Sequence, residues 1–428
     1  MSLPDTEGQQ LADPGVAAFQ LAQYAVRLHT ALDDTAATWD RLGSRNMFLS
    51  SHYLRALHAA PPSTMRFHYF TVWKGERLCG IIYTQLDTFQ AQQSISYHKD
   101  AGLPEPERGL FKQLRNLMAR RVKVHTILCG NSLVTGDHGF LFEEAVSSED
   151  QWSLVNETLH WLIRYLRKSG MRVNLLFVKD FSKPAVKKLH MVPDTRVYHG
   201  FHAQPNMILN LLEEWTTFDD YLSALSSKYR VRVRRAYKKA DTIEKRELQV
   251  VDLENHHDKI IEYYRDIAEN ASFNLFILNP EYFISVKRHL GENFRIFGYF
   301  KGDKLIAFYS LMINGDEIEA HFLGYEEETN RKYQLYQNML LDMIALAIPL
   351  HMQRIIYGRT AMEIKSTVGA EPYPMYFYLQ YQNALINRCV PWIYHTLEPE
   401  VQWVQRRPFR GEIEDAPGSP DHDQTTSD

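Results

Sequence analysis

Two stretches of the chain, one in each half, share the same alternation of apolar and polar residues. Residues 68–87, HYFTVWKGERLCGIIYTQLD, align without a gap to residues 295–314, RIFGYFKGDKLIAFYSLMIN. In each stretch an apolar segment reaches a Lys-Gly turn with an acidic and a basic residue, and a second apolar segment returns. Gly75 and Gly302 supply the positive φ angle that a tight turn requires. Both stretches are therefore predicted to be β-hairpins.

The elements that follow each hairpin are predicted to come in the same order. Each half continues through a third strand, a loop, a helix with apolar residues at helical spacing, and a last strand. Hairpins with glycine turns are common, but an ungapped match followed by one shared order favours a duplication. The three later elements are expected at 126–130, 152–168 and 172–178 in the first half and at 318–325, 333–348 and 354–358 in the second.

This order of elements predicts a mixed α/β layer in each half. An antiparallel meander comes first, and the last strand runs parallel to the third one. A loop and a helix N-terminus therefore follow the third strand, where exposed amides and the helix dipole favour an anion such as a pyrophosphate. A nucleotide or coenzyme site is expected there.

The length of the chain, 428 residues, exceeds what a single hydrophobic core ordinarily fills, so two domains are expected. We place the first at 21–205 and the second at 206–400. Residues 1–20 are expected to be a disordered N-terminus. Residues 411–428, with six acidic residues and no basic one, are expected to be a disordered acidic tail.

The sequence shows neither a membrane segment nor a secretion signal. Its longest uncharged apolar run, 343–350, falls short of the ~20 residues that span a bilayer, and the N-terminus lacks a basic and an apolar region. Cys79, Cys129 and Cys389 have no metal-binding spacing and are expected to be reduced and buried. A cytoplasmic protein without a metal is expected.

Three segments of the second half together resemble a known family. They are FDDYLSALSSKYRVRVRRAYKKA (218–240), FLGYEEETNRKYQLYQNMLLDMIALA (322–347) and RIIYGRTAMEIKSTVGAEP (354–372). With CGNSLVTGDHG (129–139) in the first half, they resemble the FemABX group of bacterial GNAT-type acyltransferases, some of which are labelled peptidoglycan-biosynthesis proteins. The resemblance implies an α/β fold of two tandem GNAT-like domains, each a mixed, mainly antiparallel sheet flanked by helices.

The function that this resemblance implies is N-acyl transfer. An acyl group would move from acyl-CoA, such as acetyl-CoA, to an amine by direct attack, without a metal or a covalent enzyme intermediate. The acceptor would be a small amine, with a cell-envelope or lipid precursor as one candidate. Residues 330–338 contain no glycine, which acyl-CoA users usually have before the donor helix. Two alternatives therefore stay open: an aminoacyl-tRNA donor, and a non-catalytic binding module.

Acyl transfer to an amine needs a base that removes the ammonium proton. The second half is expected to be the active one, and Glu319 and His321 in its third strand are candidates. Alternation puts both on one face, with Ile318 and Phe322 on the other. The alternatives are a solvent-facing or locally paired Glu319 and a hydrogen-bonded core histidine. Tyr336 is a candidate donor of a proton to the leaving thiolate.

The resemblance places the donor between the third strand and the following helix. We expect its binding residues to be Gly324, Tyr325, Lys332, Tyr333 and Gln334.

The segment 218–240 is predicted to be one basic helix with an apolar seam. Lys228, Arg232 and Arg235 lie beside that seam and are predicted to bind the acceptor or another anion, because an arginine holds a phosphate or carboxylate with two hydrogen bonds. The alternative is a solvated face whose cations complement the helix C-terminus.

Arg359 directly follows the last strand, at the start of a short helix predicted over TAMEIKST. A positive charge there opposes the helix dipole. Arg359 and Lys365 are therefore predicted to bind a carboxylate or phosphate of the donor or acceptor, with Tyr357 and Glu363 on the acceptor side. The alternative is an internal salt bridge from Arg359 to Glu363 or Glu371.

Overall fold

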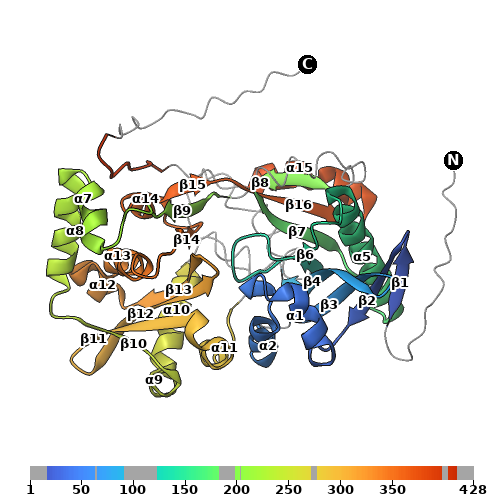
Figure 1. Ribbon diagram of the computed structural model, residues 1–428, viewed down its shortest axis with the longest axis horizontal. Coiled ribbons are helices and arrows are strands. Elements are labelled where there is room, and N and C mark those ends of the chain that lie inside the picture. Colours follow the sequence, from blue (N-terminus) through green and yellow to red (C-terminus); the bar gives the residue numbers. More distant parts are fainter. Residues whose placement is uncertain are drawn as a thin grey trace, which may run out of the picture.

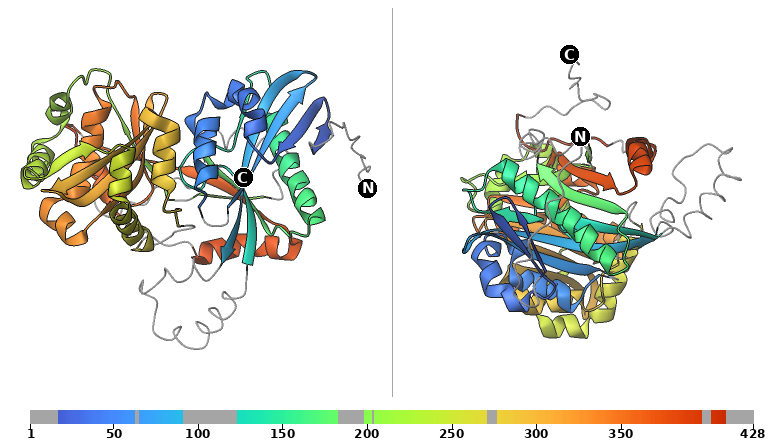
Figure 2. Two further views of the ribbon diagram at one scale, coloured as in Figure 1. Left: turned by 90° about the horizontal axis from the view of Figure 1, so that it is seen from below. Right: turned by 90° about the vertical axis from the view of Figure 1, so that its right-hand side faces the viewer.

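The structure is a computed structural model that describes residues 17–62, 65–90, 123–182, 198–202, 204–270, 277–397 and 403–411. Within these residues two β-sheets lie side by side, and helices cover their faces (Figure 1). Figure 2 shows the same two halves from below and from one end. The fold is a mixed α/β arrangement of two sheets flanked by helices, which confirms the predicted fold class.

The first sheet has nine strands, in the order β1-β2-β3-β4-β5-β7-β16-β8 with β6 paired to β4. They are β1 (Ala18–Leu21), β2 (Tyr24–His29), β3 (Arg66–Lys74), β4 (Arg77–Gln90), β5 (Lys123–Cys129), β6 (Phe140–Phe142), β7 (Leu175–Ser182), β8 (His199–His202) and β16 (Met375–Tyr381). The helices of this half are η1 (Asp33–Thr35), α1 (Ala36–Gly43), η2 (Met47–Leu49), α2 (Ser51–Ala59), α5 (Ser148–Lys168) and α15 (Ala384–Leu397).

The second sheet has seven strands, in the order β10-β11-β12-β13-β14-β9-β15. They are β9 (Asn206–Asn210), β10 (Glu244–Glu247), β11 (Phe294–Lys301), β12 (Lys304–Asn314), β13 (Glu317–Tyr325), β14 (Arg354–Gly358) and β15 (Glu371–Tyr373). Its helices are α7 (Phe218–Ala224), α8 (Ser227–Lys239), α9 (Val250–Asn255), α10 (His257–Asn270), α11 (Tyr282–Leu290), η5 (Gly291–Asn293), α12 (Glu327–Tyr333), α13 (Leu335–Ala347) and α14 (Met362–Ser366).

The predicted hairpins and the order of elements after them are confirmed. Gly75 and Gly302 both have φ angles of +59° at the turns of the β3–β4 and β11–β12 hairpins. In each half the third strand is followed by a helix and by a strand parallel to it, which gives the parallel pairs β5–β7 and β13–β14. The two halves therefore repeat one arrangement of strands and helices.

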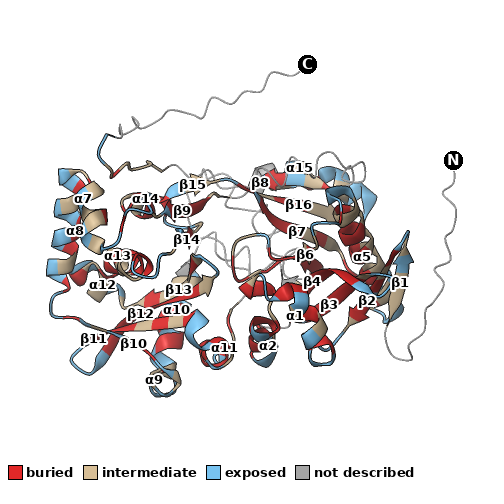
Figure 3. Ribbon diagram, in the orientation of Figure 1, coloured by how far each residue is buried: buried red, intermediate tan, exposed pale blue. Residues whose placement is uncertain are grey.

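A hydrophobic core fills the space between the two sheets and belongs to both halves. It joins Leu54 and Tyr83 of the first half to Phe283 and Phe308 of the second. Separate cores lie on the outer faces, beneath α5 in the first half and beneath α8 and α13 in the second. The buried residues, red in Figure 3, lie along the strands and on the inner sides of the helices. The two halves therefore share buried surface.

The parallel pair β13–β14 is short. It runs from Glu317 opposite Arg354 to Glu319 opposite Ile356, and then ends. Beyond that point β13 continues along β12, while β14 pairs with β9 on its other side. The second sheet therefore opens directly after Glu319.

The C-terminal part of the chain returns to the first sheet. Strand β16 lies between β7 and β8, and α15 packs on it. Residues 375–397 thus belong with the first sheet, whereas the division drawn from the sequence groups them with the second half. Residues 403–411 then cross back, where Leu225 and Phe409 form a β-bridge and the Ser226 N–H donates to the Pro408 carbonyl (2.8 Å).

Two predictions about chain segments are wrong in part. Residues 18–20 belong to β1, which pairs with β2, and so are not disordered; residues 1–16 and 412–428 lie outside the described residues. The helix predicted over 218–240 is two helices. Leu225 has an extended backbone, with ψ of 147°, because it bridges to Phe409.

Strand β13 contains a bulge that reverses its alternation. The Ser310 hydroxyl lies opposite the bulge, where it donates to the Phe322 carbonyl oxygen (2.9 Å) and accepts from the Phe322 N–H (3.1 Å). Ile318 and Leu323 pack beneath α13, whereas Phe322 packs between the sheets. The prediction that Phe322 shares a face with Ile318 is therefore wrong, because the bulge shifts the pattern.

Cys79 and Cys129 are buried as expected, whereas Cys389 is exposed on α15, which contradicts the prediction. Among the described residues no helix is long and apolar enough to cross a membrane. In the same residues no three His, Cys, Asp or Glu side chains come together as metal ligands could.

Candidate active site

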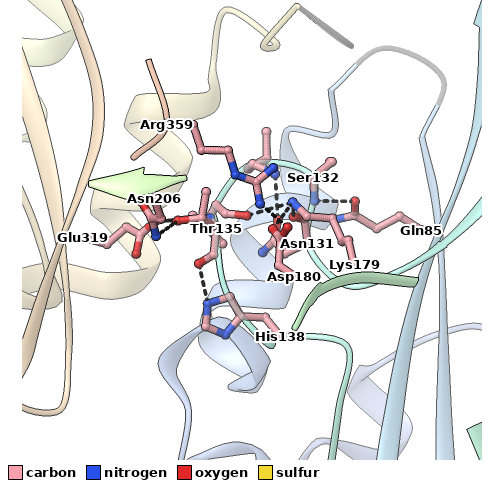
Figure 4. Close-up of polar contacts among 12 residues, drawn as sticks. Gln85, Asn131, Ser132, Thr135, His138, Lys179, Asp180, Asn206, Glu319 and Arg359 are labelled. Atoms are coloured by element: carbon pink, nitrogen blue, oxygen red, sulfur yellow. Dashed lines mark hydrogen bonds and ion pairs between the residues drawn. The ribbon is translucent and has the colours of Figure 1, made fainter. Parts of the chain in front are cut away.

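The second sheet has one apolar and one polar face where β13 and β14 separate. Ile318 and Ile355 point to the outer face and pack in the core beneath α13. Glu319 and Asn206 contact the loop 130–139 of the first half (Figure 4). The candidate site is therefore a polar cluster between the two halves.

The loop 130–139 joins β5 to β6 and is fixed by buried contacts. Asn131 Nδ2 donates to the Tyr53 hydroxyl at 2.9 Å. Gly139 allows a close approach of the two ends of the loop, since a Cβ there would come within 3.0 Å of the Gly130 nitrogen. These contacts hold the loop against the second half.

Glu319 is the titratable group at the centre of the cluster. The residue is 4% exposed, and its Oε1 accepts hydrogen bonds from the N–H (3.2 Å) and the hydroxyl (3.1 Å) of Thr135. Its other oxygen, Oε2, has no hydrogen-bond partner among the described residues. Burial raises the pKa of Glu319 to about 8, although the Thr135 bonds act in the opposite direction. A carboxyl group of this kind can exchange a proton with an amine near neutral pH.

Thr135 also connects Glu319 to Asn206, the first residue of β9. Asn206 Nδ2 donates to the Thr135 hydroxyl oxygen at 2.8 Å. That hydroxyl donates in turn to Glu319. Two residues of the second sheet are therefore linked through one residue of the first half.

An ion cluster beside these residues joins the two halves. Asp180, at the end of β7, is 1% exposed and forms ion pairs with Lys179 (2.8 Å) and with Arg359. Burial alone would raise the pKa of Asp180, but Lys179 and Arg359 hold it below its usual value. Arg359 thus has an internal carboxylate partner, although Asp180 supplies it rather than Glu363 or Glu371.

Lys365 lies on α14, the short helix that the sequence predicts. It is 4% exposed, and its Nζ donates to the Gly358 carbonyl oxygen at 3.2 Å. Burial lowers its pKa to about 7. The neighbouring Glu363 points elsewhere and pairs with Arg406 at 2.6 Å.

A pocket of about 580 Å³ opens beside this helix, and its lining includes Thr360, the residue that follows Arg359 in the chain. The end of α14 is tied to α13 by a bond from the Thr367 hydroxyl to Gln337 Oε1 (3.5 Å). The pocket is lined by Gln204, Thr360, Ala361, Met362, Glu363, Ile364, Thr367 and Trp403.

Three residues predicted for the site have packed surroundings instead. His321 Nε2 and the Tyr282 hydroxyl are hydrogen-bonded at 2.8 Å, and burial lowers the pKa of His321 to about 3. His321 is therefore the neutral core histidine of the alternative interpretation. Tyr357 is buried and donates to the Leu340 carbonyl oxygen at 2.8 Å. Burial raises the pKa of Tyr336 above its usual value.

The residues predicted to hold the donor gather where α12 meets α13. Gln334 has a φ of +52° and separates the two helices. The Lys332 ammonium lies 5.2 Å from the centre of the Tyr333 ring. The ring of Tyr325 lies 6.3 Å from that of Tyr336 on α13. The role of these residues in donor binding stays a prediction.

Gly324 has a packing role instead. A Cβ at this position would lie 2.6 Å from the backbone of Tyr263, so α10 can pack this closely on β13 only against a glycine.

The fold does not place the basic residues of α8 near Glu319. Lys228, Arg232 and Arg235 are exposed, and the first two lie 5.3 and 5.1 Å from the Tyr229 ring. The helix packs on the outer face of the second sheet, through Tyr229 and Val233, whereas Glu319 lies on the inner face.

The sequence interpretation did not include Thr135, Asn206, Lys179 or Asp180. A signal existed for Thr135, because it lies in the glycine-containing segment 129–139 that carries part of the family resemblance. No comparable signal marks Asn206 or Asp180, since Asn206 bonds to Thr135 across 71 positions of the chain and Asp180 pairs with Arg359 across 179.

Residues 227–373, which include α8, β13, α13 and β14, match the family described as "Acetyltransferase (GNAT) domain". No curated protein matches the sequence. Among solved structures, FemX is 10% identical over 87% of this chain and 99% of its own, with a TM-score of 0.50.

Two further solved structures are similar at a lower level. A tandem GNAT protein from the clavulanic acid biosynthesis pathway is 10% identical, covering 77% of this chain and 87% of its own, with a TM-score of 0.40. L-PGS from Bacillus licheniformis is 11% identical, covering 81% of this chain and 96% of its own, with a TM-score of 0.43.

Proposed function

We propose that the chain is a FemABX-like tandem-GNAT acyltransferase, which transfers an acyl group from acyl-CoA to a primary amine with Glu319 as general base. The match of residues 227–373 to the GNAT domain family and the fold shared with FemX support this proposal. The observation that carries this proposal is the state of Glu319. Its carboxyl group is buried where β13 and β14 separate, with one oxygen held twice by Thr135 and the other without a partner in the described chain.

The chemistry needs one base and a well-positioned acceptor. The ionised Glu319 carboxylate takes a proton from the acceptor ammonium, and the amine nitrogen attacks the thioester carbonyl carbon. A carbon–nitrogen bond forms, the carbon–sulfur bond breaks, and the coenzyme A thiolate leaves. The nitrogen then loses a second proton, which converts the thiolate to the thiol. Holding the amine against the thioester supplies a large part of the rate, because it replaces a bimolecular encounter.

We assign the donor to the pocket beside α14. Its volume, about 580 Å³, is within the range of small-molecule sites. It lies next to Arg359, and the end of α14 is joined to α13, the helix that follows the third strand. A tryptophan at Thr360 would fill part of this pocket and is expected to weaken donor binding.

The test measures thiol release from acetyl-CoA and from a long-chain acyl-CoA, with a set of primary amines as acceptors. We expect Glu319→Gln to lower kcat by about 10²–10⁴-fold while acyl-CoA still raises the melting temperature of the variant. Glu328→Gln is the control, because Glu328 is an exposed carboxylate on α12. It should leave both quantities unchanged.

Two results would contradict the proposal. If no coenzyme A compound shifts the melting temperature of the folded protein, the donor is not acyl-CoA. If coenzyme A compounds bind and no amine is acylated, the chain is a binding module.

One observation favours a second candidate, transfer from aminoacyl-tRNA. The exposed stripe of Lys228, Arg232 and Arg235 could contact phosphates. In that case the affinity for tRNA should fall steeply with salt, and the triple change to glutamine should reduce that dependence. If the wild type and the triple variant bind tRNA equally weakly, this candidate is excluded.

A further inference from the structure

We propose that the first half completes the active site of the second: Thr135 positions Glu319, and Asn206 and Glu319 together bind the ammonium group of the acceptor. This inference rests on the function proposed above and names the residues that recognise the acceptor. Neither Thr135 nor Asn206 was a candidate from the sequence.

The hydrogen bonds around Thr135 have a fixed direction. The Thr135 hydroxyl has one proton, which it donates to Glu319 Oε1, and so it can only accept from Asn206. Asn206 therefore turns its Nδ2 toward Thr135, at 2.8 Å, and keeps its Oδ1 for another partner. The orientation of the Asn206 amide thus follows from the position of Thr135.

Two buried acceptor atoms are left at the ends of this chain of hydrogen bonds. Asn206 Oδ1 and Glu319 Oε2 have no hydrogen-bond partner among the described residues, and the two residues are 3% and 4% exposed. Leaving such atoms unpaired is costly, and the cost is greatest for a charged group. A primary ammonium group offers three N–H donors and a positive charge, which match one amide oxygen and one carboxylate oxygen.

The place of this pair in the fold suits an acceptor. Glu319 is the last residue of β13 that pairs with β14. Asn206 lies on the far side of β14 from Glu319 and just past the end of that strand, since the next residue, Met207, pairs with Gly358, the last residue of β14. Gln204, two residues before Asn206, lines the pocket assigned to the donor. The ammonium would therefore lie between the sheet opening and the donor.

Other ionisable groups also face Glu319, and they enter the interpretation of its titration. Glu317 lies on the same strand, Lys179 comes from β7, and Tyr53 comes from α2. None of these changes in the variants proposed below, so differences between variants report on Thr135 and Asn206.

The first test needs no substrate. At pH values between the usual pKa of a glutamate and the higher pKa of Glu319 in the folded protein, the folded protein holds a proton on Glu319 that the unfolded chain has lost. Wild-type stability should therefore fall relative to Glu319→Gln as the pH rises, and the difference should level off at about pH 8.

Thr135→Val removes one of the two donors to Oε1. The difference in stability between Thr135→Val and Thr135→Val/Glu319→Gln should therefore level off about one pH unit higher than the wild-type difference does. Thr135→Ser should restore the pH at which the wild-type difference levels off. If Thr135→Val lowers stability equally at every pH and leaves this position unchanged, Thr135 is only structural and the positioning role is overturned.

The second test uses ethylammonium chloride at pH 9, with tetramethylammonium chloride as the matched salt that has no N–H donor. Ethylammonium should raise the melting temperature of the wild type more than tetramethylammonium does, and this excess should vanish in Glu319→Gln and in Asn206→Leu. Equal effects of the two salts would overturn the ammonium site.

Acyl transfer is measured separately from both tests. If the excess stabilisation by ethylammonium is present and no acyl-CoA is consumed, the ammonium site stands while the proposed function fails. If acylation occurs and Asn206→Leu changes neither KM for the amine nor the ethylammonium effect, the acceptor binds elsewhere and this inference fails alone.

Discussion

Arg359, which directly follows the last strand of one repeat, forms an ion pair with Asp180 at the end of the equivalent strand of the other repeat. Asp180 has a φ of +70° and is almost fully buried, so its carboxylate depends on Arg359 and Lys179 for its charge balance. The two repeats are thus joined at corresponding places in their sheets, beside the cluster that contains Glu319.

Replacing Asp180 with asparagine should destabilise the protein by about 3–5 kcal/mol, because it leaves two positive groups without their carboxylate. Asparagine accepts positive φ angles well, so the backbone should be unaffected. Urea unfolding measures the change. Asp33→Asn is the control, since the Asp33 carboxylate pairs with Arg55 on the surface, where it is 79% exposed, and should have little effect. A loss as small as that of the control would mean that the buried pair does not stabilise the folded protein.

Activity should depend on the ionisation of Glu319. Since burial raises the pKa of Glu319 in the free protein to about 8 and the base must be ionised, kcat/KM for the acceptor should rise with pH and level off above about pH 8. Stopped assays from pH 6 to pH 10 would measure this profile. A kcat/KM that is already constant from pH 6 would exclude Glu319 as the base.

Lys365→Met should stabilise the protein at neutral pH. The folded pKa of Lys365 is about 7 against a usual 10.5, so between these values the unfolded chain binds a proton that the folded chain does not. The cost of burying Lys365 is therefore complete below pH 7 and disappears as the pH approaches 10.5. Unfolding curves at pH 7 and pH 9.5 should show a larger gain at pH 7. An equal gain at both values would mean that the folded lysine keeps its usual pKa and is charged at both.

Ser310→Ala should cost about 1–3 kcal/mol, since it leaves the Phe322 N–H and carbonyl oxygen at the bulge of β13 without the Ser310 hydroxyl. Thermal unfolding would measure the loss, with the exposed Ser223 on α7 as the control position. An unchanged melting temperature would mean that the bulge is held by its other contacts.

The parts of the fold that local patterns determine were predictable. The hairpin around Gly302, the strand that ends at Gly358 and the helix of 335–347 all depend on residues close together in the sequence, namely a turn glycine or apolar residues at strand or helix spacing. The pairing of β16 with β7 could not be predicted from local patterns, because it joins Tyr378 to Val178 across 200 positions. The break at Leu225 likewise comes from a contact with Phe409, far along the chain.

The candidate site divides in the same way. Glu319 was found because its strand and its chemistry both point to a base, and Arg359 because its charge opposes a helix start. Their partners Thr135 and Asp180 belong to the other half of the chain, and no pattern within a short window relates them to the residues that they contact. Burial also decided between the two candidate bases, since it leaves Glu319 able to ionise near neutral pH and keeps His321 uncharged.

The return of β16 to the first sheet affects the order in which the protein can fold during its synthesis. When the ribosome has released residues 1–374, β7 and β8 are present, but the strand that lies between them has not yet emerged. The edge of β7 then stays open while the whole second repeat is made, and open edges of this kind invite pairing with other chains. A nascent chain of this protein should therefore depend on a chaperone until its last strand is released.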